Sequence, residues 1–296
     1  MVTRSGRRPE SAIVDELIRW FDEYERDLPW RRSDPWGVLV SEFMLQQTPV
    51  DRVLPVWREW LRRWPSPPSL AAASVGDALR VWGRLGYPRR AARLHASAII
   101  ITRDFEGAVP SDCDSLRALP GVGEYTVAAV QAFAFGRRSV VLDTNVRRVL
   151  ARTLDGTAQQ NPHITSAERI RSDDVWPVDD ARSARWSAAV MEFGAMVCKA
   201  RVPECGTCPI VAHCTWTHRG QPPSAPVRRQ PTYAGSDRAV RGSIMQLLRD
   251  TSGTASAQAI TAVCADSQQR EQALQGLVAD GLAVRHARGR YALPEE

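Results

Sequence analysis

The chain has 296 residues, 44% of them hydrophobic and 24% charged, which is typical of a folded globular protein and excludes a largely disordered one. This length gives room for two domains, or for one large domain with an appendage. The net charge of +6 and the pI of about 9.3 are compatible with a polyanionic partner.

The N-terminal region predicts neither a membrane anchor nor a secretory signal. Residues 1–9 are expected to form a disordered basic tail, and the acidic residues Glu10 and Asp15 interrupt what would be the apolar core of a signal. The densest apolar run of the chain, Ile99-Ile-Ile101, is far shorter than the roughly 20 residues of a membrane helix. We therefore expect a cytoplasmic protein.

Residues 10–216 are expected to form one helical core. Apolar residues recur there at three-and-four spacing, with breaks at proline or glycine, and no solenoid repeat is present. Trp57, Trp60 and Trp64 fall on one stripe of a helix predicted from about Asp51. Such a stripe indicates a core face rather than a ligand site.

Within this core, a single acidic residue lies in an otherwise uncharged segment. Glu42 is the only charged residue between Asp34 and Asp51, among valine, leucine, phenylalanine and methionine side chains. Ionisation on such an apolar helix is costly, so we expect a raised pKa that suits a general acid near neutral pH. The alternative is a structural glutamate paired with an arginine.

A glycine-containing turn, Leu119-Pro-Gly-Val-Gly123, separates a helix predicted from about Asp114 and another over 124–135. Gly121 and Gly123 are expected to allow positive φ and close approach of another backbone. The turn would present free N–H groups at the start of the second helix, where a phosphate oxygen binds well. A plain helix–helix turn is the alternative.

Asp143 follows the second glycine of this turn by twenty residues, within the run Val140-Val-Leu-Asp-Thr-Asn-Val-Arg-Arg-Val149. We expect Asp143 to be the N-cap of the helix that follows. Capping would fix its carboxylate at the helix entrance.

Four of the six cysteines lie close together, with the spacing Cys198-x6-Cys205-x2-Cys208-x5-Cys214. Short loops between ligands bring four thiolates to one point, as an iron–sulfur cluster requires. Structural zinc is the competitor, although zinc sites more often pair two C-x2-C knuckles across a longer gap. Disulfides are disfavoured in a chain that shows no export signal.

The remaining reactive residues have simpler interpretations. Cys113 and Cys264 are expected to be buried bystanders. His213 is not expected to be a ligand, because the four sulfurs complete the set. Lys199 is the only lysine among 39 basic residues, so lysine-based covalent catalysis has one candidate in the chain.

The composition changes over residues 217–236, where four prolines and two glycines predict a linker. Residues 237–296 then predict three short helices, near 237–249, 256–264 and 267–279, and a basic hairpin over 282–293 that turns near Arg288-Gly289. This arrangement resembles a small winged helix. The expected fold is therefore an all-α core with a small α+β appendage.

Taken together, these segments resemble the MutY family, adenine DNA glycosylases of the endonuclease III-like helix-hairpin-helix superfamily. The resemblance covers residues 11 to about 220 and includes three further strings, Ser41-Glu-Phe-Met-Leu-Gln-Gln-Thr48, Trp82-Gly-Arg-Leu-Gly-Tyr87 and Met191-Glu-Phe-Gly-Ala195. It implies a two-lobed helical core and a structural 4Fe–4S cluster on the four clustered cysteines. The cluster loop would press on DNA.

The resemblance also implies roles for individual residues. Glu42 would protonate the adenine leaving group, Asp143 would stabilise the oxocarbenium-like sugar, and Asn145 would help to position the carboxylates or the catalytic water. The residues that would line the adenine pocket are Trp30, Arg31, Tyr125 and Glu192. Those that would wedge the duplex and touch the base left opposite are Gln47, Thr48, Leu85 and Tyr87. Those that would bind DNA phosphates are Gly121, Gly123, Lys199 and Arg201. For Leu85 the alternative is a core leucine.

The implied partner is double-stranded DNA with adenine opposite 8-oxoguanine or guanine, bound by a monomer at the nucleoid. An N-glycosidic bond inside a duplex is out of reach, so the nucleotide must be flipped into a pocket. Loss of adenine then requires an acid for the base and an anion for the sugar cation, which two carboxylates of different pKa can provide.

Three other functions remain open. A mismatch thymine glycosylase of the same superfamily can also carry a tyrosine where Tyr125 lies, whereas a lyase of the endonuclease III type has a lysine there. A catalytically silent DNA-binding protein would not need both Glu42 and Asp143. Two departures from the family are Thr144, where many relatives carry glycine, and the lack of the long C-terminal domain with which many relatives read 8-oxoguanine.

Overall fold

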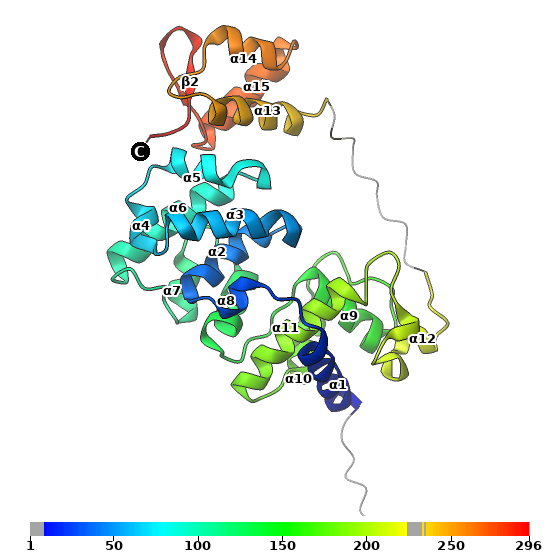
Figure 1. Ribbon diagram of the computed structural model, residues 1–296. Helices are drawn as coiled ribbons and strands as arrows, with labels where there is room; N and C mark the ends of the chain where they lie inside the picture. Colours follow the sequence, from blue (N-terminus) through cyan, green and yellow to red (C-terminus); the bar gives the residue numbers. More distant parts are fainter. Residues whose placement is uncertain (1–8, 224–232, 234, 296) are drawn as a thin grey trace, which may run out of the picture. The chain divides into compact units, whose positions relative to one another are not determined.

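The computed structural model describes residues 9–223, 233 and 235–295 (Figure 1). Contacts divide these residues into two compact units, one made of 9–32 and 124–223 and the other of 33–123, 233 and 235–295. The first eight residues of the predicted basic tail, and residues 224–232 and 234 of the predicted linker, lie outside the described residues.

The first unit is helical, and its long helix α11 (Asp180–Met196) packs against α1 (Pro9–Tyr24), α8 (Glu124–Phe135) and α9 (Thr144–Leu150). Leu17, Trp186 and Phe193 are almost fully buried in its core because these helices present apolar faces to one another. The unit also contains α10 (Ser166–Val175), α12 (Thr215–His218), a π-helical turn η3 (Ala151–Asp155) and the short 3₁₀ turns η1 (Pro29–Arg32), η4 (Cys205–Thr207) and η5 (Val211–His213).

The second unit begins with α2 (Pro35–Leu45), which is buried along almost its whole length, and α3 (Val50–Arg63). Trp57, Trp60 and Trp64 are all buried, so the predicted core stripe is confirmed. Helix α6 (Arg89–Asp104) packs against α2, α4 (Pro67–Ala71) and α5 (Val75–Trp82). The 3₁₀ turn η2 (Gly83–Leu85) and α7 (Cys113–Ala118) complete this part of the unit.

The C-terminal part of the second unit contains the elements expected from its sequence. Helices α13 (Asp237–Asp250), α14 (Ala257–Val263) and α15 (Ser267–Ala279) are followed by the antiparallel strands β1 (Val284–Arg285) and β2 (Tyr291–Ala292). Between the strands, the turn η6 (Ala287–Gly289) places Arg288 and Gly289 at positive φ, 58° and 69°. The hairpin therefore turns where the sequence predicts.

Ion pairs join this C-terminal part to the rest of the second unit. The Asp280 side chain, 14% exposed, forms ion pairs with Arg89 of α6 at 2.7 Å and with Arg241 of α13 at 2.5 Å. Arg84 of η2 donates to the Gln246 side chain at 3.2 Å. A carboxylate shared by two guanidiniums fixes geometry better than a single exposed pair does.

The mostly helical fold class is therefore confirmed, and two local predictions are wrong. Cys113 is exposed because it lies at the start of α7, directly after the N-cap Asp112, and Cys264 is only half-buried. Gly123 has no positive φ, and a side chain there would meet nothing within 4 Å. In the part of the chain that the structure describes, no helix is long and apolar enough to cross a bilayer.

Candidate active site

Glu42 lies in the middle of α2 and is 5% exposed. The helix begins at the N-cap Asp34, whose carboxylate accepts the Gly37 N–H at 2.8 Å. Trp57 of α3 donates to the Gly37 carbonyl at 2.9 Å, which fixes α2 against α3. Glu42 therefore lies on a buried helix that is fixed against its neighbour.

The four proposed wedge residues lie on two loops of the same unit. Gln47 and Tyr87 are exposed and adopt left-handed φ values of 57° and 48°. Thr48 is buried, and its hydroxyl donates to the Leu85 carbonyl at 3.3 Å. Leu85 is only 4% exposed, which agrees with the alternative of a core leucine.

The glycine-containing turn lies where the chain passes from one unit to the other. Gly121 has φ 84°, and an added Cβ would lie 2.9 Å from the Phe43 ring and 3.0 Å from Arg93. Only glycine fits there without displacing those side chains. Gly123 is exposed immediately before α8, whose first N–H groups have no partner within the helix.

Asp143, in the first unit, is the N-cap of α9, as predicted, and accepts the Val146 N–H at 2.6 Å. Asn145 donates to the other carboxylate oxygen at 2.9 Å, and Arg148 donates to the Asn145 amide oxygen at 2.8 Å. Burial raises the pKa of Asp143, and these hydrogen bonds and the Arg148 charge oppose that effect. Gly194 of α11 admits this arrangement, because a Cβ there would lie 2.8 Å from the Asn145 Cβ.

The residues expected around the base also lie in the first unit. Glu192, 3% exposed, accepts Arg26 through Nε at 2.8 Å and Nη2 at 2.7 Å, and Arg31 through Nη2 at 3.1 Å. Burial alone would raise the pKa of Glu192, but the hydrogen bonds from Arg26 and the Arg31 charge lower it. Trp30 is buried beside Arg31, and Tyr125 packs on the same small cluster as Met191.

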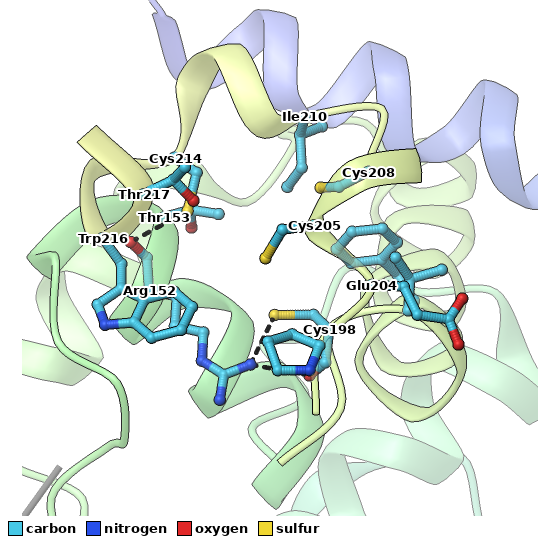
Figure 2. Close-up of a pocket in the computed structure, with 13 residues that line it drawn as sticks. Arg152, Thr153, Cys198, Glu204, Cys205, Cys208, Ile210, Cys214, Trp216 and Thr217 are labelled. Atoms are coloured by element: carbon cyan, nitrogen blue, oxygen red, sulfur yellow. Dashed lines mark hydrogen bonds between the residues drawn. The ribbon is translucent and has the colours of Figure 1, made fainter. Parts of the chain in front are cut away.

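The four clustered cysteines line one pocket of the first unit, and Figure 2 shows their side chains arranged around a common space. Phe193, Ile210 and Trp216 supply apolar walls. Burial raises the pKa of the Cys208 thiol to about 12, so only a bound cation would keep such a sulfur deprotonated. Among the described residues, no three potential ligands approach closely enough to hold a single metal ion.

Arginines surround the cysteine pocket. Arg152 donates to the Cys198 sulfur at 3.3 Å and to the Lys199 carbonyl at 2.8 Å, and it stacks on the Trp216 ring at 4.8 Å. Arg148 donates to the Cys198 carbonyl at 2.9 Å. The first cysteine is therefore held by two guanidiniums, which favour electron-rich sulfur.

Lys199, Arg201 and His213 of the cysteine loop do not line the pocket. Lys199 forms an ion pair with Glu204 at 2.5 Å, and Arg201 is exposed. His213 does not line the pocket, and its Nε2 lies 3.5 Å from a Glu16 oxygen. Lys199 would have to exchange Glu204 for a phosphate on binding DNA.

Sequence comparison assigns the family. Residues 40–171 match the family of HhH-GPD superfamily base excision DNA repair proteins. An adenine DNA glycosylase of Mycobacterium tuberculosis is 48% identical over 293 residues, covering 97% of this chain and 95% of the relative. Another, from Mycolicibacterium smegmatis, is 46% identical over 284 residues, covering 95% and 96%. This chain belongs to the adenine DNA glycosylases.

The fold of this adenine glycosylase agrees with that assignment. A solved thermostable thymine-DNA glycosylase matches with a TM-score of 0.65 at 25% identity, covering 71% of this chain and 97% of the other. The resemblance read from the sequence is therefore confirmed at the level of family and fold. The enzyme acts in base excision repair.

The sequence did not indicate two arginines that contact the proposed site residues. Arg26 provides most of the hydrogen bonds to Glu192, and Arg148 connects Asn145 to the cysteine loop. Nearly every basic residue in the chain is an arginine, so composition does not mark these two. A possible signal was the position of Arg148, one helical turn after Asn145 on the same helix face.

Proposed function

We propose that the protein hydrolyses the N-glycosidic bond of adenine mispaired with 8-oxoguanine or guanine in duplex DNA, after flipping the nucleotide out. One observation carries the proposal: a member of the adenine glycosylase family has the buried carboxylate Glu42 in α2 and the carboxylate Asp143 at the N-cap of α9. Asp143 accepts hydrogen bonds from Val146 and Asn145, which stabilise its ionised form. Two carboxylates that differ in pKa can serve as acid and anion.

In this mechanism Glu42 donates a proton to a ring nitrogen of adenine, which turns the base into a better leaving group. The C1′–N9 bond then breaks, its electrons leave with the base, and positive charge develops on the sugar. Asp143 stabilises that charge, and Asn145, hydrogen-bonded to it, holds the carboxylate in place. Water then adds at C1′ and gives one proton to the ionised Glu42, which restores the acid and leaves an abasic sugar.

The residues around Glu192 are proposed to receive the flipped base. An ionised Glu192 held by Arg26 and Arg31 is a fixed acceptor. Trp30 and Tyr125 of the same unit are proposed to supply the aromatic surface on which the purine stacks. The duplex contacts proposed for Gln47, Thr48, Leu85 and Tyr87 would come from the second unit.

A 4Fe–4S cluster is proposed for the cysteine pocket, held by Cys198, Cys205, Cys208 and Cys214. Four thiol donors with apolar walls fit such a group. Structural zinc is the competitor, although zinc sites more often pair two C-x2-C knuckles across a longer gap than this spacing has. When bound, the cluster would tie the loop together, while Lys199 and Arg201 on that loop, with Gly121 and Gly123, would bind DNA phosphates.

One assay separates this function from its alternatives. Duplexes carrying adenine, thymine or a damaged pyrimidine opposite guanine or 8-oxoguanine are incubated with the protein, and base release is measured with and without strand cleavage. The proposal expects release of adenine alone. Release of thymine from T:G would favour the mismatch thymine glycosylase, and no release from any duplex would favour a DNA-binding protein without catalysis.

The proposal also expects no lyase activity. Schiff-base chemistry needs an amine at the sugar C1′, and the only lysine, Lys199, is paired with Glu204 beside a cysteine ligand. The abasic strand should therefore stay intact, and borohydride should trap little protein on DNA. Stoichiometric trapping that persists in Lys199→Gln and after blocking of the terminal amine would contradict this expectation.

A further inference from the structure

Arg90 is a buried arginine in the first turn of α6 that the function described so far does not use. It is 6% exposed, and the described residues place no carboxylate within ion-pair distance of it. Burial lowers the pKa of its guanidinium to about 10, and its Nε is buried without a hydrogen-bond partner. A buried charge without a counter-ion is destabilising unless its hydrogen bonds compensate.

Arg90 donates hydrogen bonds to the C-terminal end of α2, the helix that carries Glu42. Its Nη1 donates to the carbonyls of Phe43 at 2.9 Å, Met44 at 3.1 Å and Gln46 at 2.5 Å. The last carbonyls of a helix have no partner within it, and a cation there is favoured by the helix dipole. Arg90 therefore supplies the donors that a further turn of α2 would have supplied. The first carbonyl that it binds, that of Phe43, follows Glu42 directly.

The other nitrogen of the guanidinium joins two loops. Nη2 donates to the Thr48 hydroxyl at 3.0 Å and to the Gly86 carbonyl at 3.2 Å. Thr48 in turn donates to the Leu85 carbonyl at 3.3 Å. A single planar group thus holds the end of α2, the loop after it and the loop before α6 in one arrangement.

Two residues of the loops that Arg90 connects are under backbone strain. Gln47 and Tyr87, one on each loop, have φ values of 57° and 48°, a region that non-glycine residues rarely adopt. The Tyr87 and Trp82 rings lie 5.4 and 5.2 Å from the Arg90 guanidinium carbon, a cation–π arrangement. Such conformations persist only where the surroundings over-determine them, and Arg90 provides that constraint.

We propose that Arg90 is a positioning residue that couples contacts of the two loops with the duplex to the placement of Glu42. Displacement of either loop by the base opposite adenine would move the hydrogen bonds that end α2, and with them the acid. The inference rests on the proposed function, because it assigns the duplex contact to these loops. It predicts that the presence of a base opposite adenine increases the rate of excision, and that this increase depends on Arg90.

The test compares two duplexes that differ only opposite the adenine. One carries 8-oxoguanine there and the other an abasic-site analogue, which offers no base to contact. Single-turnover excision is measured for the wild type, Arg90→Lys and Arg90→Met, with thermal midpoints recorded. The rate ratio between the two duplexes should fall toward one in Arg90→Met, by about 2- to 100-fold, and less in Arg90→Lys, which keeps the charge but fewer donors.

His95→Gln is the matched control. His95 lies on the same helix, is equally buried, and its Nε2 pairs with the Ala73 carbonyl at 2.8 Å, away from both loops. This variant should lose stability yet keep the wild-type rate ratio. If Arg90→Met lowers both rates by the same factor, Arg90 is only structural and the inference is overturned.

A double-mutant cycle keeps the inference testable if Arg90→Met does not fold. Arg90→Lys is combined with Tyr87→Ala, and the loss in the rate ratio should be smaller than the product of the two single losses, because both act through one joint. Losses that multiply would overturn it. A wild type that releases no adenine from either duplex would instead contradict the proposed function itself.

Discussion

Glu42 and Asp143 are both carboxylates, and their neighbours give them different tasks. Glu42 is buried within α2, and Asp143 accepts hydrogen bonds from the Val146 N–H and the Asn145 amide. Burial opposes ionisation of a carboxyl group, and the hydrogen bonds to Asp143 favour its ionised form. On this basis we propose Glu42 as the acid and Asp143 as the anion.

Glu42→Gln should retain duplex binding and lose adenine release. The amide can pack in the same space but cannot deliver a proton, and general acids typically contribute about 10²–10⁴-fold. Single-turnover excision and binding to a non-hydrolysable adenosine duplex measure the two effects separately. Glu59→Gln, on the exposed side of α3, is the control and should excise normally. Near-wild-type excision by Glu42→Gln would remove Glu42 from the mechanism.

The pH dependence of excision should report Asp143. Its pKa is raised by burial, and ionised Asp143 is the active form, so the rate should fall as the pH drops through that pKa. Arg148→Met removes a nearby positive charge, which should raise the pKa of Asp143 further and move the acid limb of kcat to higher pH.

The control for this profile is Arg169→Met in the same unit, because Arg169 pairs with the exposed Glu124. Its acid limb should coincide with that of the wild type. An Arg148→Met profile that also coincides with the wild type would show that a group other than Asp143 sets the acid limb.

At the scale of elements, helix α9 and the cysteine loop form one hydrogen-bonded assembly. Arg148 joins Asn145 to the Cys198 carbonyl, and Arg152 reaches the Cys198 sulfur and the Lys199 carbonyl. The π-helical turn η3 directly after α9 places Arg152 toward the pocket. The cysteine loop is therefore hydrogen-bonded to the helix whose N-cap is Asp143.

Cys205→Ser should lose iron and acid-labile sulfide and lower the thermal midpoint. One thiolate fewer leaves the proposed cluster incompletely held, and the binding energy of a structural metal centre is also folding energy. Anaerobic purification with iron and sulfide analysis measures this. Cys113→Ser, an exposed cysteine outside the pocket, should keep both. Stoichiometric zinc in the wild-type protein would contradict the assignment.

At the scale of the whole molecule, the C-terminal part is fixed to the second unit through Asp280, Arg89 and Arg241. Truncation before α13 would therefore also disturb the loop before α6. The exposed hairpin arginines Arg285, Arg288 and Arg290 offer a sharper test of this part, because their substitution leaves the Asp280 ion pairs intact.

Replacement of these three arginines by glutamine should weaken binding to all duplexes alike. Phosphate contacts add affinity and salt dependence but no base information, so the slope of log K against log salt should decrease by about 0.9 per lost contact. The preference for 8-oxoguanine over guanine should survive. Arg62, Arg63 and Arg103, each paired with an acid, are the charge-matched control set. Loss of that preference alone would make the hairpin a lesion reader.

The amino-acid sequence alone predicted the helical fold, the family and the clustering of four cysteines, because these depend on local information. Apolar periodicity marks helices, an N-cap needs one residue, and ligand spacing along a loop marks a metal centre. Asp143 is the N-cap that its position predicts, and the hairpin turns at Arg288-Gly289. The exposure of Cys113 and the ordinary φ of Gly123 were not predictable, since a residue type only permits burial or a turn.

The contacts of individual arginines could be learned only from the packed helices. Arg26 and Glu192 are separated by 166 residues, and Arg90 and Phe43 by 47, so no spacing rule connects them. A guanidinium has five N–H groups that can donate to any nearby oxygen, and its partners are set by which backbone carbonyls the fold leaves without a donor. In a chain whose basic residues are almost all arginine, that information exists only after the helices have packed.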